Sequence, residues 1–263
     1  MPNTLLLLGR EIPLYGLMFL VGIVLSATVA AFLARARGVS FFDLACSGVY
    51  VMFGGFLGAK LLFVAVTLPK MAELGIGWIN LIFGGFVFYG GLLGGALALA
   101  LYVRRYPEDR GVWDIYATAL PLGHACGRVG CFFAGCCYGI PYDGILSHTY
   151  TASVGLTPLG VPLLPIQLIE AASLLLLFAL QLWLFLRQGK ARRGGNALTY
   201  LISYPILRFT LEFFRGDVER GKLGCLSTSQ LISLAILIAT LSWLVMKRKS
   251  VAGRGTSKTI HPN

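Results

Sequence analysis

The stretch LYGLMFLVGIVLSATVAAFLA, from Leu14 to Ala34, contains no charged residue. It is longer than the roughly 18 apolar residues that are needed to cross a bilayer core about 30 Å thick. The whole chain of 263 residues is 57% hydrophobic and 13% charged, and its mean hydropathy is +0.77. Because ordinary globular chains have a smaller apolar share, we expect an integral membrane protein whose first transmembrane helix is this stretch.

Further apolar runs follow the first one along the chain. Six more spans are expected at residues 44–68, 79–103, 113–139, 163–186, 197–214 and 230–246. The third contains FGGFVFYGGLLGG, residues 83–95, whose glycines permit close helix approach. These patterns predict an all-α polytopic protein with seven transmembrane helices in a single domain over residues 1–250. Residues 251–263 are expected to form a basic, disordered tail.

The distribution of basic residues orients the predicted helices. The formal charge is +11, but the Lys and Arg residues lie at the ends of apolar runs and form no basic, aromatic-rich polar face, which argues against a nucleic-acid partner. With the N-terminus outside, fourteen of these residues lie in inside loops and the tail, and five lie outside. The positive-inside rule therefore predicts an outside N-terminus and a cytoplasmic C-terminus, with membrane lipids as partners of the basic residues.

A few charged residues lie within the apolar spans. They are Lys60, Arg128, Glu170, Arg208 and Glu212. A charge at mid-bilayer costs about 2.5–3.5 kcal/mol on insertion scales, so each of these residues requires a physical reason. Internal pairing or snorkelling toward the helix ends is one explanation. A polar cavity for a charged substrate is the explanation that we favour.

One motif combines several of these charges. In RFTLEFFR, residues 208–215, Arg208, Glu212 and Arg215 are spaced i, i+4 and i+7, so on a helix they share one face. The planar guanidinium group binds phosphate oxygens with two parallel donors and stays charged at any relevant pH. This spacing therefore predicts a site for the phosphate of a lipid headgroup.

Several ordered blocks together resemble a known family. They are YGLMFLVGIV at residues 15–24, the glycines of residues 84–95, GRVG at residues 127–130, LPIQLIE at residues 164–170 and the motif of residues 208–215. With these blocks, the chain resembles the prolipoprotein diacylglyceryl transferases.

The resemblance implies a seven-helix enzyme in the bacterial inner membrane, with a site open to the periplasm and to the lipid. The implied reaction moves a diacylglyceryl group from phosphatidylglycerol to the lipobox cysteine of a prolipoprotein signal peptide. It leaves a thioether and glycerol phosphate, and it requires no metal or other cofactor.

We assign roles to individual residues on this basis. Arg128 is expected to bind the lipid phosphate, Arg208 to stabilise the leaving group, and Glu212 to position the arginines. His124 is a candidate base or a structural histidine, and Tyr89 is expected to bond the headgroup or to pack. Substrate contacts are further expected from Tyr15, Lys60, Gln167, Glu170 and Arg215.

The sequence departs from the family pattern in a cysteine-rich segment. Cys131, Ala134 and Cys136 replace the asparagine, asparagine and glutamate of the family signature, and Tyr89 replaces a histidine. The four cysteines of this segment are spaced by five, five and one, unlike the short pairs of structural zinc sites. Packing, an outer-face disulfide, and a reactive or metal-binding thiol remain alternatives. Two rival functions also remain: a transferase with the same donor and another acceptor, and a non-catalytic lipid or small-molecule transporter.

Overall fold

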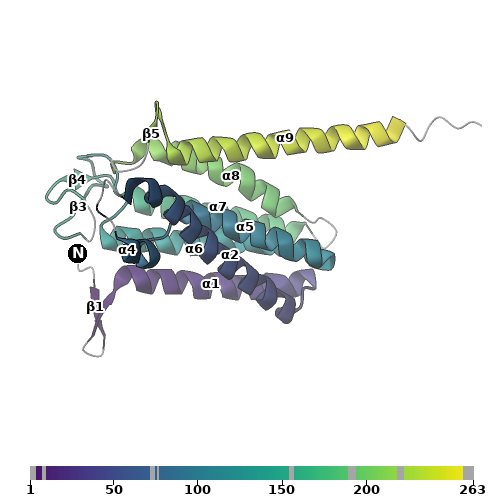
Figure 1. Ribbon diagram of the computed structural model, residues 1–263, viewed down its shortest axis with the longest axis horizontal. Helices are drawn as coiled ribbons and strands as arrows, with labels where there is room; N and C mark the ends of the chain where they lie inside the picture. The colour runs from purple at the N-terminus through teal and green to yellow at the C-terminus, as the bar shows by residue number, and fades with distance from the viewer. Residues whose placement is uncertain are drawn as a thin grey trace, which may run out of the picture. The chain divides into compact units, whose positions relative to one another are not determined.

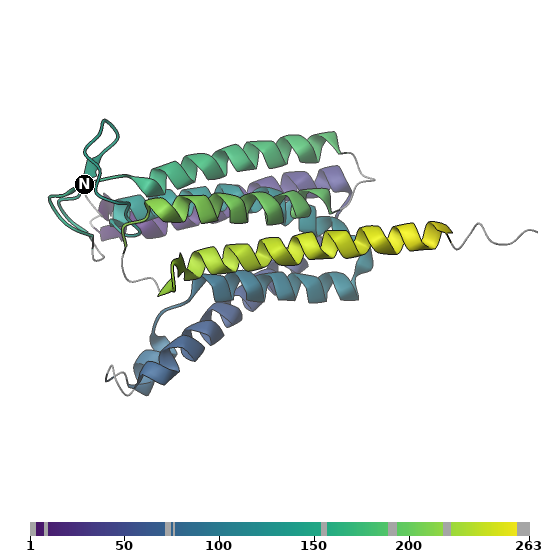
Figure 2. The ribbon, with the colours of Figure 1, turned by 90° about the horizontal axis from the view of Figure 1, so that it is seen from above.

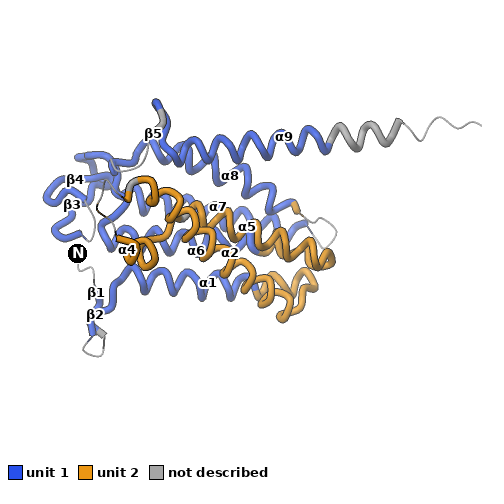
Figure 3. The backbone as a smooth tube through the Cα atoms, in the orientation of Figure 1, with its two compact units in different colours: residues 1–30, 116–189, 195–263 blue, residues 31–115, 190–194 orange. Residues whose placement is uncertain are grey.

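The computed structural model describes residues 4–7, 10–71, 75, 77–153, 157–188, 194–217 and 222–256. The chain is mostly helical, as expected, and short antiparallel strand pairs occur in its connections (Figures 1 and 2). Two compact units are distinguished in Figure 3. Unit 1 comprises residues 1–30, 116–189 and 195–263, and unit 2 comprises residues 31–115 and 190–194.

Unit 1 contains most of the long helices and all three strand pairs. Its elements are β1 (Thr4–Leu7), β2 (Arg10–Pro13), the larger parts of α1 (Leu14–Arg37) and α6 (Val112–Ala134), β3 (His148–Thr149), β4 (Pro162–Leu163), α7 (Ile166–Arg187), α8 (Gly195–Leu211), η3 (Glu212–Phe214), β5 (Lys222–Leu223), β6 (Leu226–Ser227) and α9 (Thr228–Thr256). Helix α7 packs along α8, and α8 packs along α9. A buried apolar cluster that includes Ala125, Leu174 and Tyr204 joins α6, α7 and α8.

Unit 2 is built on close contact between two helices. Its elements are the end of α1, α2 (Phe41–Thr67), η1 (Leu68–Lys70), α4 (Trp78–Phe83), α5 (Phe88–Arg105), η2 (Pro107–Gly111) and the start of α6. A Cβ atom added to Gly58 would lie 2.9 Å from Gly94 Cα, and one added to Gly94 would overlap the carbonyl of Gly54. The glycines therefore bring the backbones of α2 and α5 into direct contact, a case of the close helix approach that their spacing was expected to permit.

The third predicted span is not one continuous helix. Residues 84–87 are irregular and separate α4 from α5. Helix α2 provides hydrogen-bond partners for two backbone groups at this break. Lys60 Nζ donates to Gly84 O (3.2 Å), and Val87 N donates to Ala59 O (3.1 Å). Within a membrane, irregular backbone needs such partners from neighbouring protein. Lys60 is thus held at the break, with the rings of Phe63 and Phe86 about its ammonium group.

Two further predicted spans end earlier than expected. Helix α6 ends at Ala134, because Gly135 adopts a left-handed conformation (φ 66°), so residues 135–139 lie in a loop. Helix α8 ends at Leu211, and Glu212 begins a 3₁₀ turn. The tail predicted for residues 251–263 is described as far as Thr256.

Four helical segments of the described chain are long and apolar enough to cross a membrane. They are Leu14–Arg37, Phe41–Thr67, Ile166–Arg187 and Thr228–Lys247. They establish the character of a multi-pass membrane protein. Some cations that orient the predicted topology lie outside the described residues, namely Lys190, Arg192, Arg193, Arg220 and Lys258.

Candidate functional site: an arginine cluster around Glu170

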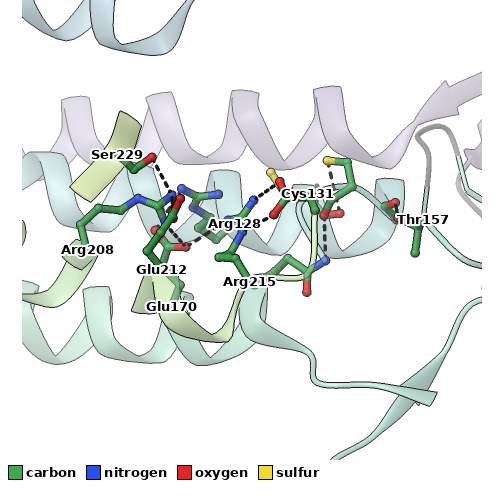
Figure 4. A network of polar contacts seen from close by, with 12 residues as sticks. Arg128, Cys131, Thr157, Glu170, Arg208, Glu212, Arg215 and Ser229 are labelled. Atoms are coloured by element: carbon green, nitrogen blue, oxygen red, sulfur yellow. Dashed lines mark hydrogen bonds and ion pairs between the residues drawn. The ribbon is translucent and has the colours of Figure 1, made fainter. Parts of the chain in front are cut away.

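A single buried carboxylate lies among three arginines in unit 1. Glu170 of α7, which is 1% exposed, forms ion pairs with Arg128 of α6 (3.0 Å), Arg208 of α8 (3.5 Å) and Arg215 (3.8 Å). The three arginine side chains are themselves largely buried. Figure 4 shows these residues in one continuous row of contacts that also includes Glu212. The charges predicted from three separate spans therefore meet at one place.

The local backbone explains how Arg208 and Arg215 both reach Glu170. Arg208 and Glu212 remain one turn apart and form an ion pair of 2.5 Å, but Glu212 already belongs to η3. Arg215 follows η3 in an extended conformation (φ −84°, ψ 135°) and pairs with Gly139 in a β-bridge. The prediction that Arg208, Glu212 and Arg215 share one helical face is therefore wrong for Arg215, which lies beyond the end of the helix.

A second carboxylate fixes Arg215. Its Nε and Nη2 atoms both donate to Asp217, each at 2.9 Å. Burial alone would lower the pKa of Arg215, but the hydrogen bonds and charge of Asp217 outweigh it, so the pKa of Arg215 is raised. Arg215 therefore stays charged while Asp217 holds its guanidinium plane.

The arrangement leaves hydrogen-bonding capacity at its centre. Three buried guanidinium nitrogens have no hydrogen-bond acceptor among the described residues: Arg128 Nε, Arg208 Nη1 and Arg215 Nη1. The last two are the atoms that form ion pairs with Glu170 at 3.5 and 3.8 Å, and neither Glu170 oxygen has a hydrogen bond among the described residues. Buried donors are rarely left unmet, so an anion with several oxygens suits this cluster.

The carboxylate that joins the arginines is Glu170, whereas the sequence assigned the positioning role to Glu212. Glu212 contacts Arg208, whose Nη2 atom also donates to Ser229 of α9 (3.3 Å). The sequence assigned Glu170 to substrate contact. Its position in the chain did not show that it would pair with three arginines.

The other predicted residues of unit 1 lie around this cluster. Tyr15, in the first turn of α1, lies beside Gly130 of the GRVG motif, because a Cβ atom at Gly130 would lie 3.3 Å from the Tyr15 ring. His124 lies one helical turn before Arg128, and its ring centroid is 5.5 Å from that of Tyr204. Tyr89 and Lys60 belong to unit 2, where Tyr89 lies on α5 and Lys60 on α2.

The loop that follows α6 is held by several polar side chains. Gln167, predicted to bind substrate, donates its amide to Cys136 O (2.8 Å) and Tyr150 Oη (3.1 Å). The hydroxyls of Ser153 and Thr157 both donate to Gly135 O. Burial raises the pKa of Tyr150 to about 12, so its hydroxyl stays protonated.

Sequence reasoning did not single out Tyr150, Ser153, Thr157 or Asp217. All four lie in connections without periodicity. Hydroxyl groups in a loop that begins near a charged motif are the only signal that could have drawn attention to the first three.

The fold and the site together define a class: a multi-pass membrane protein with a buried arginine cluster suited to a phosphate-bearing ligand. Residues 3–246 match the family described as prolipoprotein diacylglyceryl transferase. The chain therefore belongs to the prolipoprotein diacylglyceryl transferase family.

Named relatives agree with this assignment. The chain is 36% identical over 233 residues to phosphatidylglycerol–prolipoprotein diacylglyceryl transferase 2 of Clostridium perfringens, covering 88% of this chain and 89% of that protein. It is 33% identical over 244 residues to the transferase of Clostridium tetani, covering 88% and 92%. For the transferase of Synechococcus elongatus the identity is 30% over 250 residues, covering 90% and 85%.

Proposed function

We propose that this protein transfers a diacylglyceryl group from phosphatidylglycerol to the lipobox cysteine thiol of prolipoproteins. The products are a thioether and glycerol phosphate. Family membership over nearly the whole chain supports the reaction class. The observation that carries the proposal is the convergence of Arg128, Arg208 and Arg215, each with a buried donor that has no acceptor among the described residues.

The cluster suits the charge changes of this reaction. The acceptor thiolate attacks a glycerol carbon of the lipid, and the phosphate oxygen on that carbon departs with the bonding electrons. Negative charge on the phosphate group grows during this step. Fixed guanidinium donors in a buried place stabilise the growing charge more than the starting diester, and this difference accelerates the reaction.

Each residue has a distinct part in the proposed step. Arg128 binds the phosphate of the bound lipid, and Arg208 stabilises the departing oxygen. Arg215 adds a third donor whose orientation Asp217 fixes. Glu170 and Glu212 hold the guanidinium groups in place and prevent like-charge repulsion from separating them. Tyr15 lies where it can contact the headgroup.

The membrane arrangement is proposed with seven spans in a single domain over residues 1–250, with the tail at residues 251–263. Helices α1, α2, α5, α6, α7, α8 and α9 provide the spans. The N-terminus is outside and the C-terminus is cytoplasmic, following the excess of basic residues in inside loops. In the bacterial inner membrane this topology directs the arginine cluster toward the periplasmic face, where prolipoproteins are presented.

One rival retains specific support. Where the family signature has asparagine and glutamate, this chain has Cys131 and Cys136, and both lie next to the arginine cluster in sequence. A transferase that uses the same lipid donor with a different acceptor would keep the arginines and change this segment.

Complementation tests the proposal. The intact gene should restore growth and prolipoprotein lipidation in a strain depleted of its own transferase, whereas Arg128→Ala and Arg208→Ala variants should not. Membrane fractions are probed for each variant, so that lost activity is not confused with lost expression. An intact protein that accumulates in the membrane but lipidates no prolipoprotein would contradict the reaction. Release of labelled glycerol phosphate in the same cells would then favour the rival acceptor.

A further inference from the structure

Three thiols lie together next to the arginine cluster. Cys131 is in the last turn of α6, and Cys136 and Cys137 are in the loop that follows. Their sulfur atoms all lie within 4.8 Å of one another. A tetrahedral zinc ion, with Zn–S bonds of about 2.3 Å, places its sulfur ligands about 3.8 Å apart. We infer that Cys131, Cys136 and Cys137 bind one zinc ion as thiolates and leave its fourth position for the acceptor thiol.

Backbone, amide and thiol hydrogen bonds hold the loop in place, and one of them is donated by the Cys136 thiol to Cys131 O (3.7 Å). Cys136 N donates to Cys131 O (3.1 Å), and Gln167 donates to Cys136 O. Cys137 is the one non-glycine residue of the described chain with a left-handed backbone (φ 59°). Such a conformation is costly for a side-chain-bearing residue and is concentrated at functional sites. The loop is therefore shaped so that Cys137 joins the other two thiols.

The surrounding charges leave a place for a cation. Three arginines are matched by Glu170, Glu212 and Asp217, so the cluster has no net positive charge to stabilise three thiolates. A zinc ion supplies two positive charges. Three thiolates and one zinc ion together carry a single negative charge. This charge lies near Arg128 and next to Arg215, which contacts the Cys137 thiol.

The ligand set favours zinc with an open position. Thiolates select soft or borderline metals such as zinc over magnesium or calcium. No fourth His, Cys, Asp or Glu joins the group within the described part of the chain. Three protein ligands and one open position are the arrangement of catalytic zinc sites. The three cysteines are half-buried, so a substrate group can reach them.

This inference rests on the proposed function and departs from the sequence-based expectation that no metal is required. When the acceptor thiol binds zinc it loses its proton to water. The thiolate sulfur forms a bond to the glycerol carbon as the carbon–oxygen bond to phosphate breaks, and the electron pair leaves on the phosphate oxygen. No group is oxidised or reduced. The neutral thioether product is a weaker zinc ligand than a thiolate, so it is released.

Metal content tests the site directly. Full-length protein is purified in detergent without chelators, and zinc per chain is measured by elemental mass spectrometry. The test variant carries Cys131→Ser, Cys136→Ser and Cys137→Ser. The matched control carries the same substitution at the other three cysteines, Cys46, Cys126 and Cys225. We expect about one zinc per chain in the wild type and the control, and at least a tenfold loss in the test variant.

Two further measurements keep the inference falsifiable if the triple variant does not fold. Cobalt(II) added to metal-stripped wild type should give thiolate-to-cobalt charge-transfer absorption, and the single Cys136→Ser variant should weaken it. Wild-type protein that is purified without chelators, contains no zinc and has six thiols that all react with a thiol reagent would overturn the inference. A disulfide within the cysteine cluster, which appears as thiols released only by a reductant, would also overturn it.

Activity measurements separate this inference from the proposed function. Transfer to a prolipoprotein peptide should be lost with 1,10-phenanthroline, kept with its non-chelating 1,7 isomer, and restored by zinc. Transfer that persists in zinc-free protein would overturn the inference and leave the proposed function standing. A wild type that binds zinc through these cysteines but transfers nothing would refute the proposed function and leave the metal site standing.

Discussion

The helices of unit 1 meet around buried charges, whereas α2 and α5 of unit 2 meet through bare backbone. Glu170 and its arginines place at least four ionised groups among apolar helices. Gly54, Gly58, Gly90 and Gly94 instead remove side chains, so that two helices touch directly. Glycine contacts stabilise membrane helices through packing alone. Buried charges in a membrane are expensive, so their presence indicates a function that packing does not require.

The largest expected effect comes from removing the centre of the charged cluster. Glu170→Gln leaves Arg128, Arg208 and Arg215 facing one another with no shared anion. Breaking a buried ion pair on one side costs about 3–5 kcal/mol, so we expect strong destabilisation and low membrane accumulation. The free energy of unfolding in mild detergent measures this effect. Glu11→Gln on exposed β2 is the control, expected within about 0.5 kcal/mol of wild type. A Glu170→Gln protein as stable as wild type would mean that the arginines do not depend on this anion.

Arginine-to-lysine changes separate the phosphate-binding role from charge pairing. Arg128→Lys and Arg208→Lys keep a positive charge opposite Glu170 but remove the planar fork of donors. Loss of one preorganised donor to a developing anion costs about 10²–10³ in rate, so we expect that reduction in transfer from labelled phosphatidylglycerol. Arg35→Lys, at the exposed end of α1, serves as the matched control. Full activity in both lysine variants would show that the cluster is structural, like the glycine contact.

The same contrast explains what the sequence could predict. Apolar runs indicate helices by composition alone, and the glycines of residues 83–95 predicted a close helix approach, although they did not identify α2 as the partner of α5. Arg128, Glu170 and Arg208 stood out because each interrupts an apolar run. The structure of unit 1 brings these three residues together in ion pairs.

The parts that escaped prediction depend on backbone geometry at helix ends. The left-handed turn at Gly135 and the 3₁₀ turn at Glu212 redirect the chain by interactions that hydropathy does not encode. That redirection brings Arg215 to Glu170 and gathers three cysteines whose spacing in the sequence fits no common metal motif. The break at residues 84–87 was hidden for a related reason, since its polar partners come from α2.

A glycine substitution should disturb packing without disturbing chemistry. A Cβ atom in Gly94→Ala overlaps the Gly54 carbonyl, and overpacking of this kind costs about 1–3 kcal/mol. We expect a lower thermal midpoint for membrane protein in detergent, with an unchanged transfer rate per folded molecule. Gly16→Ala is the control, because no atom lies within 4 Å of its added Cβ. A Gly94→Ala variant with normal stability but slow transfer would assign a catalytic part to unit 2 and weaken the contrast between the units.

A neutral polar contact should give the smallest effect and completes the comparison. Thr118 Oγ1 accepts from Asn196 Nδ2 at 2.9 Å, and both residues are fully buried in unit 1. Thr118→Val keeps the shape and removes this acceptor. Hydrogen bonds between membrane helices average about 0.6 kcal/mol, because the unfolded segments also find partners in the membrane. We expect a loss of that size in the free energy of unfolding. Thr28→Val, whose hydroxyl bonds only within α1, should lose less. A loss for Thr118→Val as large as that for Glu170→Gln would show that buried polarity in general, rather than net charge, distinguishes unit 1 from the glycine contact.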